Sequence, residues 1–267
     1  MIADKARKVI AQQFVFIFFL HEQLLRQSVK NVKYIKMIDS KKYLIIGASS
    51  GIGAALLNVL NADQHQVITA SRRNITDSHT HIPFDITKDE LNLSLLPDSL
   101  DGLAYCPGSI NLKPFHRIPD QEFIDEFNLN VIGAIKVVRS VLPLLKKSQQ
   151  SSIVFFSTIA VQQGMPFHSS IAAAKGALEG LTRSLAAEFA PKIRVNCIAP
   201  SLTNTPLAAR LLSSDEKKKT SDERHPLKRI GEAEDVANLA AFLLSPQSSW
   251  ITGQIIHADG GLSAIRV

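Results

Sequence analysis

The sequence predicts a single α/β domain built on a parallel sheet with helices on both faces. From Tyr43 onward, short apolar runs alternate with longer stretches of helical period, which is the pattern of a doubly wound sheet. Strands of such a sheet are buried on both faces, so they are continuously apolar and do not alternate. A length of 267 residues, 45% apolar and 20% charged, suits one domain of this class.

Seven apolar runs are predicted as strands. They cover residues 43–46, 66–70, 81–84, 102–106, 152–156, 193–198 and 254–257. Helices fill the gaps, and the clearest is 171–189, where Glu179 and Arg183 lie four residues apart on one face. Asp120 begins another helix. The polar segment 213–223 is expected to be a solvated helix face or a mobile flap.

Composition and charge exclude several classes of protein. Residues 1–36 carry seven Lys and Arg against two Asp and Glu, which leaves 23 against 22 for the remainder. A nearly neutral body is not expected to bind nucleic acid. Cys106 and Cys197 fall in two different predicted strands and lack C-x-x-C spacing. This is typical of reduced thiols in a cytoplasmic protein, and it predicts neither a zinc site nor a redox motif.

The first 36 residues form a separate extension whose role stays open. The apolar run 14–20 follows a basic cluster, but it is shorter than the roughly 20 residues of a membrane-spanning helix. No small-residue cleavage pattern of a signal peptide follows it. The extension is a membrane-surface arm, a packed helix, or the product of a start assigned too early, with Met37 as the true start. The domain itself is expected to cover residues 37–267.

A glycine-rich turn follows the first predicted strand directly. The turn consists of Gly47, Ala48, Ser49, Ser50, Gly51, Ile52 and Gly53 and opens a predicted helix. Glycines let the backbone approach a pyrophosphate closely, and the helix N-terminus offers it unpaired N–H groups and a partial positive charge. A glycine pattern alone is weak, but the strand–turn–helix context is what a dinucleotide site requires.

The end of the second strand indicates which dinucleotide binds. A carboxylate there would bind the ribose 2′-OH and repel a 2′-phosphate. The segment instead ends in Ser71, Arg72 and Arg73, and guanidinium groups grip phosphate through paired hydrogen bonds. The sequence therefore predicts NADP(H) in preference to NAD(H), with solvated loop arginines as the alternative explanation.

Further segments between residues 41 and 262 resemble the short-chain dehydrogenase/reductase family. They are Phe84-Asp85-Ile86-Thr87, Asn128-Leu129-Asn130-Val131-Ile132-Gly133, Arg194-Val195-Asn196-Cys197-Ile198-Ala199-Pro200, Arg229-Ile230-Gly231-Glu232-Ala233-Glu234-Asp235-Val236-Ala237, Ile251-Thr252-Gly253-Gln254 and Asp259-Gly260-Gly261. The resemblance implies a Rossmann-like seven-stranded sheet, hydride transfer with a small-molecule substrate, and a homodimer or homotetramer. It also implies that Asp85 lies by the adenine, that Thr205 lies by the nicotinamide, that Pro200 belongs to the cofactor site, and that a lid covers about 205–226.

The catalytic positions of the family are only partly retained. By resemblance, Lys175 is the family's Lys, Thr158 stands where Ser is expected and Asn130 fills the Asn position. The family's proton-transferring Tyr, four residues before the Lys, is replaced by Ile171. Loss of a positioned general acid typically costs about 10² to 10⁴ in rate. A second departure lies after the fourth strand, where the family's Asn-Asn-Ala-Gly is Tyr105-Cys106-Pro107-Gly108.

Other groups near Lys175 are weaker candidates for the proton donor. His168 has a suitable unperturbed pKa, near 6.5, but a loop histidine without a catalytic role is the stronger interpretation. Ser169 and Ser170 are expected to act as helix N-caps. The 2,4-dienoyl-CoA reductases resemble this chain locally, because they also replace the Tyr and keep the Lys. In that chemistry an oxyanion needs hydrogen bonds more than an immediate proton.

Three hypotheses follow, and they differ in class. The first is an NADP(H)-dependent oxidoreductase acting on a small apolar carbonyl, enone or enoyl substrate by a non-standard proton path. The second is a cofactor-binding module that has lost turnover and serves as a sensor or partner subunit. The third is a membrane-associated, lipid-modifying reductase anchored by residues 1–36. The first is preferred, with a cytoplasmic location and no membrane contact expected.

Overall fold

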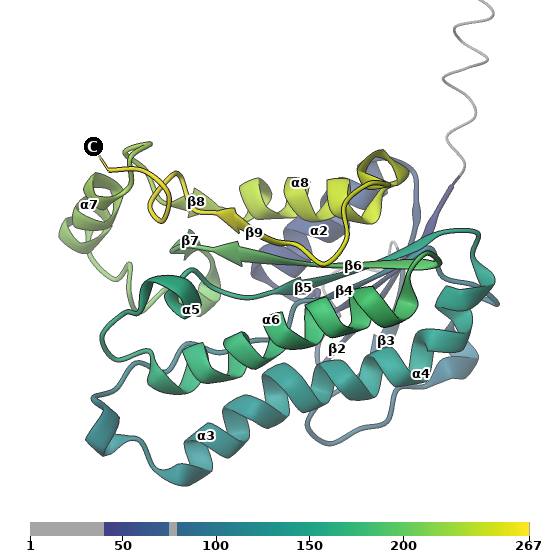
Figure 1. The fold of residues 1–267 in the computed structure, drawn as a ribbon, viewed down its shortest axis with the longest axis horizontal. Helices are drawn as coiled ribbons and strands as arrows, with labels where there is room; N and C mark the ends of the chain where they lie inside the picture. The colour runs from purple at the N-terminus through teal and green to yellow at the C-terminus, as the bar shows by residue number, and fades with distance from the viewer. Residues whose placement is uncertain (1–39, 75–78, 267) are drawn as a thin grey trace, which may run out of the picture. The chain divides into compact units, whose positions relative to one another are not determined.

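The computed structural model describes residues 40–74 and 79–266, so the predictions for the N-terminal extension lie outside the described residues. Seven strands form one parallel sheet in the order β3-β2-β1-β4-β5-β6-β9 (Figure 1). The strands are β1 (Lys42–Ile46), β2 (Gln66–Ser71), β3 (Thr80–Pro83), β4 (Gly102–Tyr105), β5 (Ser151–Phe156), β6 (Ile193–Pro200) and β9 (Ile255–Ala258). The predicted fold class is confirmed.

The predicted strands are all present, with ends that differ by one or two residues. The prediction placed Cys106 inside a strand, and this is wrong, because β4 ends at Tyr105 and Cys106 begins the following loop, half-buried. Apolar character alone does not mark where a strand leaves the sheet. A short pair, β7 (Thr203–Asn204) with β8 (Gly231–Glu232), was not predicted.

Helices cover both faces of the sheet, as Figure 1 shows. On one face α2 (Gly51–Ala62) packs beside α8 (Ala233–Leu244), and on the other lie α3 (Asp120–Phe127), α4 (Gly133–Lys147) and α6 (Ser169–Phe189). The remaining helices are α5 (Ala160–Gln163) and α7 (Asp215–Arg224), and five short helical turns are η1 (Leu93–Leu95), η2 (Phe115–Arg117), η3 (Asn128–Ile132), η4 (Pro206–Ala208) and η5 (Pro246–Ser248).

Two apolar clusters fill the space between the layers. One lies under α4 and α6 and includes Tyr105, Val141 and Phe155; the other lies under α2 and α8 and includes Leu56 and Ile198. Burial of this kind is the main stabilising contribution to such a domain. Because all seven strands are parallel, their carboxyl ends lie along one edge of the sheet.

The helix that begins at Asp120, as predicted, is interrupted by a turn of π-helix. α3 continues through η3, the π-turn, into α4, and Asn130 lies within that turn. The combined helix 120–147 is long and apolar enough to cross a membrane by composition, but it packs on the sheet as a core helix. Single π-turns inside helices are frequent at functional sites.

The predicted features of α6 and α7 are present in the structure. Glu179 and Arg183 approach to 4.0 Å on one face of α6, and the buried Glu179 also accepts a 2.6 Å hydrogen bond from Ser157 Oγ. The polar segment forms α7, whose residues are mostly exposed, which confirms the solvated helix face. Its N-cap is Ser214, which accepts a 3.3 Å hydrogen bond from Lys217 N.

Candidate active site

Two of the cavities at the carboxyl edge of the sheet are lined by predicted site residues. The first, of about 560 Å³, lies where the strand order reverses between β1 and β4, and the second, of about 870 Å³, lies beyond the ends of β5 and β6. The loops that follow β4 and β6 contribute to both. In open α/β sheets, ligands bind at such a reversal point. We refer to them as the nucleotide cavity and the substrate cavity.

Backbone geometry shapes the nucleotide cavity at the turn after β1. Gly47 and Gly51 have φ values of 82° and 56°, which side chains rarely tolerate. A Cβ atom at Gly53 would lie 2.3 Å from the Gly47 carbonyl oxygen, so only glycine lets α2 approach the turn this closely. Ser49, Ser50 and Ile52 line the cavity beside them. The turn therefore has the cradle that a pyrophosphate requires.

The N-terminus of α2 points its unpaired N–H groups toward this cavity. Ser50 is its N-cap, in extended conformation, and its side chain makes no capping hydrogen bond. The first turn of α2 contains no acidic residue. A helix end with open donors and no carboxylate suits a bound anion.

The structure separates the two arginines at the end of β2. Arg72 is exposed and lines the nucleotide cavity, whereas Arg73 is exposed but is not one of its lining residues. Ser71 is buried and its Oγ donates a 2.8 Å hydrogen bond to the Arg73 carbonyl oxygen, which holds this loop. Ser71 and Arg72 thus occupy the predicted cofactor site.

The remaining predicted cofactor residues surround the same cavity unequally. Asp85 lines it, and its Oδ1 accepts hydrogen bonds from Thr87 N at 3.0 Å and Thr87 Oγ1 at 2.7 Å, which lower the pKa of Asp85. Thr205 lines it from the opposite side, in contact with the Gly51 position. Pro200 ends β6 and accepts a 3.1 Å hydrogen bond from Ile159 N, but it is not one of the residues that line this cavity.

Lys175, on α6, lies next to Gly108, which lines the nucleotide cavity, and is not itself one of the lining residues of that cavity. Its side chain is only 7% exposed, and its Nζ lies 3.4 Å from where a Cβ of Gly108, a residue lining that cavity, would stand. Burial lowers the pKa of Lys175 to about 8, although the neighbouring Cys197, Glu126 and Cys106 oppose the shift. Burial also raises the pKa of both thiols to about 12, so both are neutral at pH 7.

Asn130 lies at the same point from the other side. It is fully buried, and its Oδ1, 3.6 Å from the same Gly108 position, has no hydrogen-bond partner in the described structure. Its Nδ2 donates to the Glu126 carbonyl oxygen at 2.9 Å and to Glu126 Oε2 at 3.0 Å. Asn130 Oδ1 and Lys175 Nζ therefore lie next to the same position, that of Gly108.

Thr158 and Ile171 differ in what they offer the site. Thr158 follows β5 and lines the substrate cavity, where its hydroxyl accepts a 3.3 Å hydrogen bond from Ala160 N. Ile171 is 5% exposed in the first turn of α6 and carries no polar atom. The substrate cavity thus has a hydroxyl at the predicted position, and Ile171 supplies no proton.

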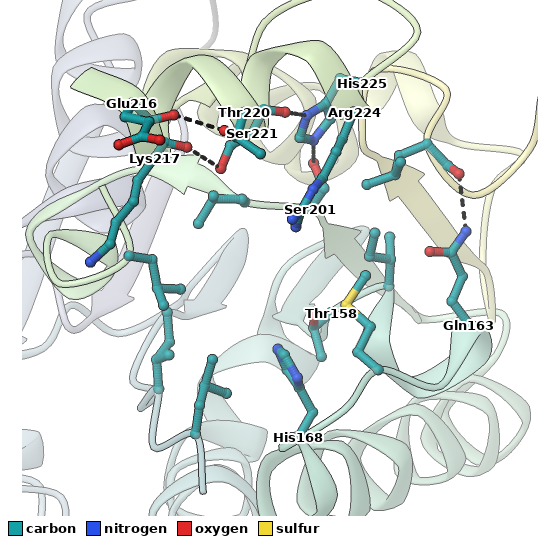
Figure 2. Close-up of a pocket in the computed structure, with 17 residues that line it drawn as sticks. Thr158, Gln163, His168, Ser201, Glu216, Lys217, Thr220, Ser221, Arg224 and His225 are labelled. Carbon is teal, nitrogen blue, oxygen red and sulfur yellow. Dashed lines mark hydrogen bonds between the residues drawn. The ribbon is translucent and has the colours of Figure 1, made fainter. Parts of the chain in front are cut away.

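His168 projects into the substrate cavity on the same side as Thr158 (Figure 2). Its Nδ1 lies 2.7 Å from the Pro166 carbonyl oxygen, and because a carbonyl only accepts, Nδ1 carries the proton and Nε2 is the nitrogen available to a ligand. The preceding Phe167 has a φ of 69°, which is rare for a bulky residue. Such strain often marks functional segments.

The prediction that Ser169 or Ser170 caps α6 is wrong. The helix begins at Ser169, its N-cap is His168, and no side chain makes a capping hydrogen bond there. Ser170 is fully buried, and its Oγ has no hydrogen-bond partner in the described structure. Serine before an apolar helical stretch predicts a cap, but here the tertiary contacts of the preceding loop set where the helix starts.

Several polar residues of the site escaped the sequence analysis. Glu126 is 2% exposed beside Asn130, and His225 is 3% exposed, with its Nε2 2.9 Å from Ser201 Oγ in the wall of the substrate cavity. Arg224, at the end of α7, also lines this cavity (Figure 2). In the sequence, Glu126 and Arg224 look like ordinary charged residues on polar helix faces. The one available signal for Glu126 is that it lies four residues before Asn130, on the same face of a helix.

The sheet order, the glycine cradle at the reversal point and the buried lysine define a Rossmann-like protein with the build of a dinucleotide site. Residues 47–263 match the family model described as Enoyl-(Acyl carrier protein) reductase. This chain belongs to the short-chain dehydrogenase/reductase family.

Individual relatives support the same assignment. A tropinone reductase homolog of Arabidopsis thaliana is 35% identical over 82% of this chain and 92% of its own length. The 3-oxoacyl-(acyl-carrier-protein) reductase FabG of Thermotoga maritima is 30% identical, over 84% of this chain and 98% of its own. The aldohexose dehydrogenase of Thermoplasma acidophilum superimposes with a TM-score of 0.79 at 27% identity, covering 85% of this chain and 97% of that one.

The family assignment carries general properties with it. Members are oxidoreductases that use nicotinamide cofactors, bind small-molecule substrates and are typically oligomeric. One structural relative, a single-residue variant of ElxO, contains bound NADPH, and it superimposes with a TM-score of 0.77 at 25% identity over 85% of this chain and all of its own.

Proposed function

We propose that this protein is an NADP(H)-dependent oxidoreductase that transfers a hydride to or from a small apolar carbonyl, enone or enoyl substrate without a catalytic tyrosine. The observation that carries the proposal is the meeting of Lys175 and Asn130 at Gly108, where the nucleotide cavity approaches the substrate cavity. A buried, partly unsatisfied polar pair at a junction of two cavities is costly unless it acts on a ligand.

The residues of the nucleotide cavity fit the cofactor. Gly47, Gly51 and Gly53 with the N-terminus of α2 would hold the pyrophosphate, and Arg72 would bind a 2′-phosphate. Asp85 would lie by the adenine, and Thr205 would lie by the nicotinamide. When bound, the nicotinamide supplies the hydride.

Two side chains can supply the proton that reduction of a carbonyl consumes. Lys175 is the first, because burial lowers its pKa to about 8, so that it is charged at neutral pH yet releases a proton far more readily than an exposed lysine. His168 is the second: its Nδ1–H is held by the Pro166 carbonyl oxygen, and in the doubly protonated ring Nε2 would donate its proton into the substrate cavity. Thr158 would donate a hydrogen bond to the substrate oxygen.

The walls of the substrate cavity indicate a modest, largely apolar substrate. Ile110, Leu112, Met165, Leu202 and Leu211 are among its apolar lining residues, and Thr158 and His168 would fix the orientation of the substrate. The helix α7 adds the charged side chains of Glu216, Lys217 and Arg224 to the same wall, so a polar end of the substrate would lie on that side. The segment 205–226, which includes the exposed α7, would act as the lid over this cavity. A cytoplasmic homodimer or homotetramer is the assembly that we propose.

The direct test is NADPH oxidation by the purified protein in single-turnover mode, against ketones, aldehydes, enones and enoyl- or dienoyl-CoA thioesters, with NADH in parallel. Turnover confined to conjugated substrates would support hydride transfer in which an oxyanion is held by hydrogen bonds. Turnover with NADH but not NADPH would contradict the cofactor assignment.

A second candidate function is a cofactor-binding module without turnover, and the buried, unreactive Ile171 favours it. Tight NADPH binding, measured by fluorescence, together with no turnover of any substrate in the panel would support this alternative. The same lack of turnover would contradict the oxidoreductase proposal.

A further inference from the structure

A buried carboxylate that the family resemblance did not indicate lies next to the reacting groups. Glu126, on α3, is 2% exposed. It accepts hydrogen bonds from Ser109 Oγ, from Asn111 Nδ2 at 3.1 Å and from Asn130 Nδ2 at 3.0 Å. All three donors are neutral side chains. Burial of a carboxylate among neutral donors costs free energy that an apolar residue at this position would avoid.

The carboxylate determines which way the Asn130 amide points. Both hydrogens of its Nδ2 are used, one by the Glu126 main-chain carbonyl oxygen and one by the carboxylate. A flipped amide would place Oδ1 against two acceptors, so the orientation is fixed by the network. The buried Oδ1 is therefore held without a partner, beside Gly108 at the end of the nucleotide cavity.

The same carboxylate influences the charge on Lys175. Lys175 Nζ and Asn130 Oδ1 lie 3.4 and 3.6 Å from the same Gly108 position, and Asn130 is hydrogen-bonded to Glu126, so one side chain separates the carboxylate from the ammonium. Cys106 after β4 and Cys197 on β6 are the other titratable groups that act on the charge of Lys175. Both thiols are neutral at pH 7, so Glu126 is the acidic member of this set. Its negative charge favours the ammonium form of Lys175, against the desolvation that disfavours it.

We propose that Glu126 is a positioning residue of the active site, which aims the Asn130 carbonyl oxygen at the cofactor end of the cavity and keeps Lys175 protonated. This inference rests on the proposed oxidoreductase function. Where no tyrosine is present, the proton for the substrate oxygen comes from the Lys175 ammonium, which becomes a neutral amine. Glu126 favours the regain of a proton from solvent after each turnover.

The test measures the protonation of Lys175 without cofactor or substrate. Protein labelled with ¹³C at lysine Cε is titrated by NMR, and the Lys175 resonance is assigned by its loss in Lys175→Arg. The expected midpoint is about 8 in the wild type. In Glu126→Gln, the loss of the negative charge is expected to lower the midpoint by about one pH unit, a roughly tenfold drop in proton affinity.

Glu122→Gln is the matched control. Glu122 lies one turn earlier on α3, lines the same shallow cleft as Glu126 and pairs with Lys113 instead. It removes the same charge without contacting Asn130, so the Lys175 midpoint should stay within about 0.2 units of the wild type. An equal shift in both variants, or an unshifted midpoint in Glu126→Gln, would overturn the proposal.

A second variant covers the case in which Glu126→Gln does not fold. Ser109→Ala combined with Glu126→Leu removes the carboxylate together with one of its donors, which is the less costly way to empty a buried polar network. The same downward shift of the Lys175 midpoint is expected. Glu126→Asp, which keeps the charge, should restore most of the wild-type midpoint.

The two proposals fail separately. A shifted midpoint in a protein that turns over no substrate would contradict the oxidoreductase function and leave the electrostatic role of Glu126 in place. Turnover in the wild type with an unshifted midpoint in Glu126→Gln would overturn the role of Glu126 alone.

Discussion

The nucleotide cavity and the site around the start of α6 are shaped by different parts of the chain. At the turn after β1, the backbone conformation shapes the cavity. Gly47 and Gly51 have positive φ angles, and Gly53 lies so close to the Gly47 carbonyl oxygen that a side chain does not fit there. Around the start of α6, side chains shape the site: Ile171 stands where the family has its tyrosine, and His168 lines the substrate cavity.

The difference teaches which half of such a site can change. A turn that binds pyrophosphate through its backbone tolerates few substitutions, because its shape depends on glycine conformations. It does not determine which substrate the protein accepts. The side-chain half can exchange one proton carrier for another while the fold stays intact. We therefore expect substitutions in the first half to abolish binding and substitutions in the second half to alter chemistry.

The largest effect is expected at Lys175. Lys175→Met should lower the single-turnover rate of hydride transfer by about 10² to 10⁴-fold, because the charged donor is lost. In the wild type, turnover that requires the ammonium should be high below pH 8 and fall above it. A rate that is unchanged in the variant would place the proton source elsewhere, with His168 next in line.

The same variant should be more stable at neutral pH. The pKa of Lys175 is about 8 in the folded protein, below its usual 10.5, so the unfolded chain binds more protons between these values. The destabilisation is complete below pH 8 and disappears above about pH 10.5. Thermal unfolding should show Lys175→Met gaining about 2 to 3 kcal/mol at pH 7, and exposed Lys146→Met should show no such gain.

Gly53→Ala tests the backbone half. The added Cβ would meet the Gly47 carbonyl oxygen at 2.3 Å, so the turn or α2 must move. NADPH affinity, measured by fluorescence titration, should fall by about 100-fold, with a loss of about 2 to 4 kcal/mol in stability. Gly180→Ala on α6 is the control: a Cβ there meets open space within the chain, and stability should rise by up to about 1 kcal/mol.

Ile171→Tyr sharpens the comparison from the other side. If the rest of the site is intact, a hydroxyl at this position should raise ketone reduction by about 10 to 100-fold. Ile171→Phe adds the same ring without the hydroxyl and should give no gain. Equal rates in the two variants would show that Lys175, Asn130 and Thr158 are not arranged for this chemistry.

The smallest effect is expected at the end of β2. Arg72→Ala should weaken NADPH binding about tenfold and leave NADH binding unchanged, because only the 2′-phosphate contact is lost. Arg73→Ala should have less effect, since Arg73 does not line the nucleotide cavity. Equal affinity of the wild type for both cofactors would contradict the NADP(H) assignment.

Much of this organisation could be predicted from the sequence. Continuous apolar runs between helical stretches predicted all seven strands of the parallel sheet. The glycine pattern predicted a tight turn directly after β1. These features depend on local patterns, namely side-chain period and the conformations that only glycine adopts. The spacing of Lys175 from Asn130 and Thr158 also placed them at one edge, through the family resemblance.

The tertiary structure alone decided which polar side chains lie close to Asn130 and Lys175. Glu126 looks like one more charge on a solvated helix until the π-turn and the loop after β4 enclose it with Ser109, Asn111 and Asn130. The position of His168 in the cavity wall depends on the strained loop before α6. A sequence specifies period and backbone freedom directly, but burial and charge on a side chain depend on segments that only folding brings together.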